Sequence, residues 1–380
     1  MELKEYREQI DRIDEELVRL FQERMKVSAA IGQYKKENGL PVLDRSRERE
    51  KLSALLGRTE EELQSYVHVL YSLLFELSRS YQSRLTGEPT PLQRRITEAV
   101  ETTPRLFPPR AEVACQGVEG AYSQIACEKL FSMPGILYFN NFESVFAAID
   151  QGLCTYGVLP LENSTAGSVN KIYDLMSRYD FSIVRSVRLK VDHNLLAKRG
   201  VKKEEIREIV SHEQALAQCA AFLKSLGDVK LTVCENTAAA AKLVAESDRR
   251  DLAALSSRAC AELYDLSCLA DSVQDKGNNY TRFICISKKL EIYPGADKTS
   301  VMIMTDHKPG ALYKLLARFY ALGINLTKLE SRPLPDRDFE FMFYFDLETS
   351  VYSPEFITLI GELESSTEQF RYLGSYSEMV

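Results

Sequence analysis

Several features that mark particular protein classes are missing from this 380-residue sequence. No apolar run reaches the roughly 20 residues that a membrane-spanning helix needs. The first residues, MELKEYREQIDRIDEEL, are charged throughout, which argues against a signal peptide. The formal net charge of −7 argues against a general nucleic-acid binder, although local arginines can still attract an anionic substrate. We therefore expect a cytoplasmic protein that binds neither nucleic acid nor membrane.

The cysteines and histidines lack the spacings typical of metal and redox sites. The eight cysteines include no CxxC pair, so free thiols in a reducing compartment are the simplest interpretation. The four histidines lie far apart, and no spacing among them suits a metal ion. The sequence therefore predicts no metal and no cofactor. The cysteines stand at positions 115, 127, 154, 219, 234, 260, 268 and 285, and the histidines at 68, 193, 212 and 307.

Length and composition, with 45% hydrophobic and 27% charged residues, predict a globular chain of two or three domains. Apolar residues recur every three or four positions up to residue 85, which indicates helices. The first ends at Asn38–Pro41, a second covers Ser46–Leu56, and a third continues through Arg84. The first helix, about 50 Å long, cannot form the core of a compact monomer alone. It therefore implies a partner helix or a partner chain.

The rest of the chain follows two other patterns. Residues 89–111 are rich in proline and read as a linker with a short helix near Leu92–Val100, which assigns residues 1–88 to the helical domain. Residues 112–290 alternate strands with helices, which predicts an α/β region with largely parallel sheets and two lobes around a cleft. Residues 297–380 follow the ferredoxin-like order strand-helix-strand-strand-helix-strand. The expected strands of the α/β region are Val113–Cys115, Ile136–Phe139, Tyr156–Leu159, Ile183–Leu189, Glu208–Val210, Leu231–Cys234, Leu252–Leu255 and Phe283–Ile286.

Cations on the first helix fall into two groups. Arg24 and Lys35 are 11 positions apart, a rotation only about 20° from a whole number of turns, so they share a face. Arg7 lies 17 positions before Arg24, which places it on another face and about 25 Å away along the axis. If Arg7 and Arg24 serve one reaction, Arg7 must reach the site of a second chain. Periodicity alone leaves open a charged bundle with solvated polar faces.

Taken together, the polar residues of this segment resemble the site of the all-helical chorismate mutase family. They are Arg7, Arg24, Lys35, Asp44, Arg47, Glu48, Ser78 and Gln82. The resemblance implies a dimeric three-helix domain that rearranges chorismate, a dicarboxylate, to prephenate without a nucleophile or a metal. Such an enzyme holds a compact conformer and stabilises negative charge on the breaking ether oxygen.

The resemblance also implies a role for each position. Arg24, with Arg7 of the partner chain, would grip the carboxylates. Lys35 and Gln82 would be the catalytic donors to the ether oxygen. Glu48 would accept a hydrogen bond from the ring hydroxyl. The remaining positions, Asp44, Arg47 and Ser78, would complete the substrate-binding site.

Four short stretches of the α/β region carry polar or glycine-rich junctions. They are GVEGAYS (117–123), VLPLENSTAGSV (158–169), SHEQALAQC (211–219) and NNYTRF (278–283). Each has a structural interpretation by itself: a tight strand–helix turn, a strand end, a helix cap or β propensity. For His212, a helix cap and a general base both stay open. Loops at strand ends are nevertheless where open α/β folds bind ligands.

In this order, the four stretches resemble the prephenate dehydratase family, with PLEN and TRF as the most specific parts. Val118 and Ala121 depart from that family, which commonly has proline and serine there. The resemblance implies that Thr281 is the catalytic hydroxyl in the conversion of prephenate to phenylpyruvate, a reaction in which a positioned proton donor matters. Arg282 is the expected partner of a substrate carboxylate. The implied prephenate-binding residues are Glu162, Asn163, Ser164, Gln214, Thr281 and Arg282.

The C-terminal segment carries DHKPGALYKLL (306–316) and NLTKLESRP (325–333). Both resemble the ACT family as it occurs with prephenate dehydratases, where it binds phenylalanine at a domain interface. GAL would let a helix N-terminus approach the ligand carboxylate. A dimerisation module without ligand is the alternative. The implied phenylalanine-binding residues are Gly310, Ala311, Leu312, Asn325, Leu326, Glu330, Ser331 and Arg332.

The sequence therefore predicts a bifunctional enzyme of phenylalanine synthesis, with the small-molecule substrates chorismate and prephenate and the effector L-phenylalanine. We expect a homo-oligomer, either a dimer or a tetramer. A non-catalytic amino-acid sensor or solute-binding protein is the rival hypothesis, because a two-lobed α/β region with a ligand module would also suit it. The constellation of polar residues in the helical domain argues against that rival.

Overall fold

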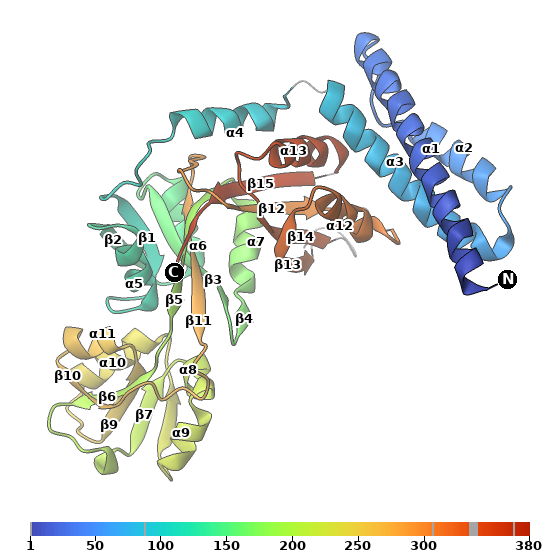
Figure 1. The fold of residues 1–380 in the computed structure, drawn as a ribbon. Helices are drawn as coiled ribbons and strands as arrows, with labels where there is room; N and C mark the ends of the chain where they lie inside the picture. Colours follow the sequence, from blue (N-terminus) through green and yellow to red (C-terminus); the bar gives the residue numbers. More distant parts are fainter. Residues whose placement is uncertain (1, 87–88, 306–307, 334–340, 368) are drawn as a thin grey trace. The chain divides into compact units, whose positions relative to one another are not determined.

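The structure, a computed structural model, describes residues 2–86, 89–305, 308–333, 341–367 and 369–380 (Figure 1). The chain forms two compact units. The first comprises Met1–Glu98, Ile303–Leu329 and Pro333–Arg371, and the second Ala99–Met302, Glu330–Arg332 and Tyr372–Val380. No helix in the described ranges has the length and hydropathy required to cross a membrane.

The N-terminal helices are confirmed. They are α1 (Leu3–Glu37), α2 (Arg45–Leu56) and α3 (Gln64–Thr86), with a short 3-10 helix at Glu61–Leu63 and a further helix, α4 (Pro91–Thr102), in the expected linker. The helix α1 ends where Gly39 adopts a φ of +63°, a conformation that favours glycine. Helix α3 packs against both α1 and α2. Much of the apolar side of α1 is nevertheless exposed, including Leu3, Ile10, Ile13, Leu17, Val27 and Ile31.

The second unit contains a seven-stranded first sheet with the order β16-β5-β11-β3-β1-β2, in which β4 also pairs with β3. Its strands are β1 (Glu112–Gln116), β2 (Gly135–Phe139), β3 (Tyr156–Asn163), β4 (Gly167–Ser168), β5 (Ser182–Lys190), β11 (Tyr280–Ser287) and β16 (Glu378–Met379). The helices of this lobe are α5 (Tyr122–Leu130), α6 (Phe142–Asp150) and α7 (Asn170–Arg178). Buried side chains such as Val158, Val187 and Phe283 form its core.

A five-stranded second sheet with the order β10-β6-β9-β7-β8 builds the other lobe. Its strands are β6 (Asn194–Lys198), β7 (Glu208–Ser211), β8 (Lys230–Val233), β9 (Leu252–Ser256) and β10 (Leu266–Ala270). Its helices are α8 (Glu213–Gln218), α9 (Ala220–Ser225), α10 (Thr237–Glu246) and α11 (Arg258–Leu263), with a 3-10 helix at Lys203–Glu205. The chain enters this lobe after β5 and leaves it before β11 (Figure 1). Two lobes were expected.

The expectation of largely parallel sheets was wrong. Strand β11 runs antiparallel to both of its neighbours, β3 and β5, and β6 runs antiparallel to β9 and β10. Parallel pairs join β1 to β2 and β3, and β7 to β8 and β9. The returning strand β11 enters the middle of the first sheet, and its direction is set by the lobe that precedes it. Each sheet is therefore mixed.

The C-terminal elements are β12 (Lys298–Met304), α12 (Ala311–Ala321), β13 (Asn325–Pro333), β14 (Phe341–Glu348), α13 (Pro354–Ser366) and β15 (Gln369–Tyr376). Their four strands pair in the order β13-β14-β12-β15. Strand β16 follows β15 but joins the first sheet, where Glu378 stands opposite Ser186 of β5. The last residues of the chain thus belong to the α/β region.

Candidate active sites

Helices α1 and α3 bring three of the predicted chorismate-site positions together. Arg24 donates to the hydroxyl of Ser78, and Gln82 Nε2 donates to Ser28 Oγ at 2.7 Å. Burial lowers the pKa of the Arg24 guanidinium, while the nearby Tyr71 and Glu48 oppose that shift. Arg24, Ser78 and Gln82 therefore line one junction between the two helices.

The other predicted positions of this set surround the start of α2. Lys35 Nζ donates to the carbonyl of Val42 at 2.6 Å. Asp44 is the N-cap of α2 and accepts from the backbone N–H of Arg47 at 2.9 Å, so it has a structural role here. The guanidinium of Arg47 is exposed and pairs with Glu50 of its own helix. Arg7 is exposed near the start of α1, and its role in a second chain's site stays a prediction.

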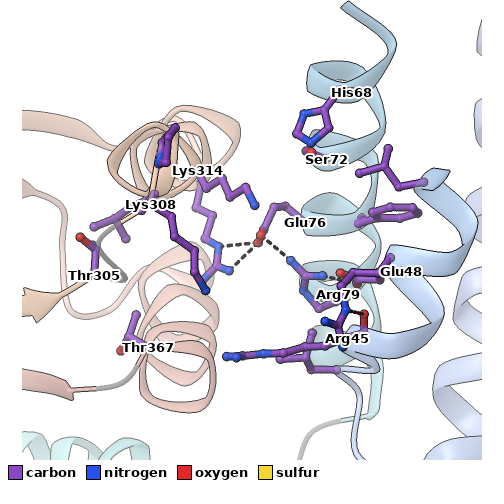
Figure 2. A pocket seen from close by; sticks show the side chains of 18 of the residues that line it. Arg45, Glu48, His68, Ser72, Glu76, Arg79, Thr305, Lys308, Lys314 and Thr367 are labelled. Carbon is purple, nitrogen blue, oxygen red and sulfur yellow. Dashed lines mark hydrogen bonds and ion pairs between the residues drawn. The ribbon is translucent and has the colours of Figure 1, made fainter. Parts of the chain in front are cut away.

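An ion-pair network that sequence reasoning missed involves Glu48, the predicted acceptor for the ring hydroxyl (Figure 2). Arg79 binds both Glu48 and Glu76, and Arg318 binds Glu76 with contacts of 2.5 and 3.1 Å. Burial alone would raise the pKa of the Glu76 carboxyl, yet Arg318 and Arg79 lower it overall. The network stands beside a cavity of about 780 Å³ whose lining includes Glu48 but none of the other predicted chorismate residues.

In the second unit, β3 and β11 place the predicted dehydratase residues side by side. Thr281 stands opposite Asn163 in the antiparallel ladder, and Arg282 stands opposite Glu162. Asn163 Nδ2 donates to Thr281 Oγ1 at 3.0 Å, and Arg282 Nε lies 2.9 Å from Glu162 Oε1. Successive residues of a strand point to opposite faces of the sheet. The Thr281–Asn163 pair and the Arg282–Glu162 pair therefore face opposite sides.

The orientation of the Asn163 amide is determined by its neighbours. Its Oδ1 accepts hydrogen bonds from the backbone N–H groups of Thr165 and Ala166, at 3.0 and 2.9 Å. Backbone N–H groups can only donate, so Nδ2 must be the group that faces Thr281. Thr281 Oγ1 accepts that hydrogen bond, which leaves the hydroxyl proton of Thr281 to be donated elsewhere. This arrangement suits a proton donor.

Three further side chains extend this cluster, and sequence reasoning did not single them out. Asn163 Nδ2 also donates to Asn279 Oδ1 at 2.7 Å, and Asn279 Nδ2 donates to Gln218 Oε1 at 2.9 Å. Gln218 Nε2 donates to Thr165 Oγ1 at 2.7 Å. Because Gln218 ends α8 in the second lobe, this site contains residues of both lobes. All three residues lie inside the quoted motifs, but no periodic pattern distinguishes them there.

Two of the remaining predicted prephenate residues have local partners. Ser164 Oγ donates to the carbonyl of Asn278 at 2.6 Å and accepts from the N–H of Tyr280 at 2.9 Å, which ties its loop to β11. The backbone N–H of Gln214 donates to His212 Nδ1 at 3.3 Å. His212 is therefore the N-cap of α8, as the helix-cap interpretation predicted.

The glycine-rich turn before α5 serves packing. Gly120 has a φ of +88°, and a Cβ added there would lie 2.8 Å from the sulfur of Cys260. The hydroxyl of Ser257 and the thiol of Cys260 both donate to the carbonyl of Gly120. A close approach of the turn to α11 thus explains this glycine, as the structural interpretation of the motif predicted.

Two predicted effector residues contact the α/β region. Ser168 Oγ donates to Glu330 Oε2 at 2.6 Å. Arg332 donates two hydrogen bonds to the Asp174 carboxylate of α7, from Nε at 2.9 Å and from Nη2 at 3.1 Å. This carboxylate raises the pKa of Arg332. Ser331, between them, is exposed. Glu330 and Arg332 therefore join β13 to β4 and α7.

The other predicted effector residues lie around α12 and at the start of β13. Gly310 precedes α12 with a φ of +81°, and Ala311 and Leu312 form the first turn. Asn325 Nδ2 donates to Glu348 Oε2 at 2.8 Å, and Leu326 follows it on β13. Asp306 and His307 of the motif lie outside the described residues.

The two sites define a class: proteins with an N-terminal helical domain whose helices share a polar cluster, joined to a two-lobed α/β domain whose polar site lies where the lobes meet. Family models agree with this class. The model "Chorismate mutase type II" matches residues 6–83, and "Prephenate dehydratase" matches residues 113–291.

Individual relatives cover most or all of the chain. The bifunctional chorismate mutase/prephenate dehydratase of Aquifex aeolicus is 33% identical over 99% of this chain and 98% of its own length. Arogenate dehydratase 2 of Petunia hybrida is 39% identical over 78% of this chain and 79% of its own. A prephenate dehydratase from Arthrobacter aurescens, solved in complex with L-Phe, has a TM-score of 0.65 and 26% identity over 70% of this chain and 90% of its own. The chain belongs to the bifunctional chorismate mutase/prephenate dehydratase family.

Proposed function

We propose that this chain converts chorismate to prephenate in its helical domain and prephenate to phenylpyruvate in its α/β domain. The observation that carries the second activity is the Asn163–Thr281 hydrogen bond, since it holds the threonine as an acceptor and leaves its proton for the substrate. The amino-acid sensor hypothesis provides no reason for the cations gathered on the N-terminal helices.

For the mutase reaction, the chain supplies charges rather than a nucleophile. Arg24, held by Ser78, would bind a carboxylate of chorismate. Lys35 and Gln82 would donate to the ether oxygen as negative charge develops there, which lowers the barrier because the donors are already oriented. Glu48 would accept from the ring hydroxyl. Its carboxylate already forms an ion pair with Arg79.

For the dehydratase reaction, prephenate must lose its ring hydroxyl together with a carboxylate as carbon dioxide. Hydroxide is a poor leaving group, so protonation by a positioned donor is worth about 10²–10⁴-fold. Thr281 would donate that proton, while Asn163 and Asn279 fix its orientation. Arg282 was expected to bind a substrate carboxylate. Arg282 instead pairs with Glu162 on the face of the sheet opposite to Thr281, which supports a role in holding the Glu162 side chain.

A second copy of the chain is the partner that suits the helical domain. The exposed apolar residues of α1, among them Leu3, Ile10 and Leu17, would lose contact with water against another copy of the same helix. An arrangement of that kind would also bring Arg7 to the neighbouring site. A homodimer or tetramer, located in the cytoplasm, is therefore part of the proposal.

The C-terminal elements have the strand order of a ferredoxin-like module, which supports an ACT assignment for residues 297 onward. Phenylalanine would bind with its carboxylate at the N-terminus of α12 and its ring against Leu312 and Leu326. The related Arthrobacter enzyme was solved with L-Phe, which favours this effector. Inhibition of the dehydratase would require unequal affinity for two enzyme states.

Coupled assays test both activities on the purified chain. Loss of chorismate absorbance measures the mutase, and formation of phenylpyruvate from prephenate measures the dehydratase. Because some relatives are named for arogenate, that compound belongs in a parallel assay. The independent-domain part of the proposal expects residues 1–88 to retain mutase activity. A chain that consumes none of the three compounds would refute the enzymatic assignment.

A further inference from the structure

The hydrogen bonds of the dehydratase site continue past the predicted residues to a buried histidine. His193 follows β5 in the segment that leads into the second lobe, and only 3% of its surface is exposed. Its Nε2 lies 2.9 Å from Gln218 Oε1. Its backbone is held on both sides, because its N–H donates to Gln274 Oε1 and its carbonyl accepts from the N–H of Val273. The ring is thus fixed at the end of a chain that starts at Thr281.

The direction of each hydrogen bond in that chain follows from the backbone donors at Asn163. Since Asn163 Nδ2 donates to Asn279 Oδ1, the other end of the Asn279 amide must be the donor toward Gln218. Gln218 therefore presents its oxygen to Asn279 and to His193. An amide oxygen only accepts, so His193 Nε2 must carry a proton.

The second nitrogen of the ring agrees with this assignment. Nδ1 of His193 is buried and has no hydrogen-bond partner in the part of the chain that the structure describes. A proton on Nδ1 would be a buried donor without an acceptor, which is unfavourable. Burial also lowers the pKa of His193. The neutral form with its proton on Nε2 satisfies both conditions.

We propose that His193 is a positioning residue of the dehydratase reaction, which holds the Gln218 amide in the orientation that lets Asn279 accept one Asn163 Nδ2 proton while Thr281 accepts the other. The inference rests on the proposed dehydratase function. A reversed Gln218 amide would set its NH₂ group against that of Asn279. Reversal of Asn279 would then set two NH₂ groups together at Asn163. His193 opposes this sequence, because a reversed Gln218 amide would force the ring proton onto Nδ1, which has no hydrogen-bond acceptor among the described residues.

Two variants separate the hydrogen bond from packing. His193→Phe keeps a ring of similar size and removes the donor, whereas His193→Gln keeps an N–H donor near the position of Nε2. We expect His193→Phe to lower dehydratase kcat by about tenfold or more, since the lost interaction acts on the transition state, with KM within about threefold. His193→Gln should recover kcat to within about threefold of the wild type. Circular-dichroism spectra and melting temperatures of the same samples report whether the α/β domain that contains His193 is folded.

The tautomer can be tested on the wild-type protein without any activity assay. Nitrogen-15 spectra of the four histidine rings, with His193 identified by its absence in His193→Gln, should show Nε2 protonated and Nδ1 unprotonated at pH 7. An Nδ1–H tautomer overturns the proposal. Full dehydratase activity in His193→Phe overturns it too, as does an equal loss in both variants. A wild-type chain without dehydratase activity refutes the proposed function instead, and the spectra still test the assigned hydrogen bonds.

Discussion

Glu162 and Asn163 are neighbours in β3, yet they act on opposite faces of the first sheet. Asn163 pairs with Thr281 on one face, and Glu162 pairs with Arg282 on the other. Ser168 stands opposite Glu162 in the β3–β4 hairpin and bonds to Glu330 of β13. Strand β3 therefore carries the proposed chemistry on one face. On its other face, through the hairpin with β4, it carries the contact with the C-terminal segment.

Thr281→Val should remove the proton donor while keeping the size and β propensity of the side chain. We expect dehydratase turnover to fall at least about 10²-fold, with the mutase rate unchanged. Ser287→Ala, which removes another buried hydroxyl of β11, is the matched control and should stay near wild type. Turnover of Thr281→Val within threefold of wild type would remove Thr281 from the mechanism.

Asn163→Asp keeps the shape of the side chain and the oxygen that accepts from Thr165 and Ala166. It replaces the donor toward Thr281 and Asn279 with a second oxygen, which would face Asn279 Oδ1. We expect dehydratase kcat to fall by about tenfold or more because the threonine loses its fixed orientation. Steady-state kinetics measure this, and an unchanged kcat would contradict the assigned polarity of the site.

Phenylalanine inhibition should depend on the contacts of β13 with β4 and α7. In a Ser168→Ala, Asp174→Asn double variant, the residues proposed to bind phenylalanine at α12 stay intact, but the bonds to Glu330 and Arg332 are lost or weakened. We expect binding to persist while inhibition weakens, consistent with a coupling free energy of about 1–3 kcal/mol.

The matched control for this variant is Lys171→Ala, which removes an exposed ion pair with Glu143 from the same helix α7. Dehydratase rate against phenylalanine concentration, together with calorimetric binding, gives the result. Equal inhibition in the double variant and the control would show that the coupling takes another route. Gly310→Val should act differently, by weakening phenylalanine binding itself.

Arg7→Ala and Arg24→Ala chains should each be nearly inactive as mutases. If Arg7 serves the partner's site, a mixture of the two variants forms hybrid dimers with one intact site, and part of the activity returns. Chorismate consumption before and after subunit exchange measures this. A mixture no better than either variant would exclude the partner-chain role of Arg7.

Acid should destabilise the wild-type chain through His193. Burial lowers its pKa, His212 adds to that shift, and Gln218 and Asp192 oppose it. Above about pH 7.5 the ring is neutral in both the folded and unfolded states, so it adds nothing. Below about pH 6.5 the unfolded state takes up the proton more readily than the folded state, which reduces the free energy of unfolding by at most about 1.4 kcal/mol per pH unit.

The variant His193→Gln lacks this group and should lose less stability between pH 7.5 and 5.5. Circular-dichroism melts of both proteins at the two pH values measure the difference. An identical change in melting temperature for both would mean that His193 titrates normally in the folded chain.

Helix prediction succeeded because α1, α3 and α4 have apolar periodicity and because α1 and α2 end at plain terminators, Gly39 and Gly57. Strands β6 and β10 were missed, since short runs such as NLLAK and LSCLA carry no alternation that separates a buried strand from a helix. The direction of β11 could not be predicted from the local sequence pattern either, because it depends on where the chain re-enters the sheet.

The candidate site was predicted in part. Asn163 and Thr281 were identified by their motifs, and the ladder explains why they meet. Gln218 was missed in favour of Gln214, four residues earlier on the same short helix. Residues four positions apart lie on the same face of a helix, so the choice depends on which turn of α8 meets the other lobe, which is a tertiary property. The opposite faces of Glu162 and Asn163 did follow from strand geometry, but only once their pairing with β11 was known.

The pairing of β16 with β5 has a consequence for how the chain folds. Arg188 and Glu378, which form an ion pair at 2.7 Å, are 190 positions apart in sequence. The whole second lobe and the C-terminal elements lie between them. Closing so long a loop is entropically costly and slow, whereas the second sheet is built from one continuous stretch. Refolding from denaturant should therefore order the second lobe early and attach β16 late, so the edge of β5 is the surface most open to mispairing in the meantime.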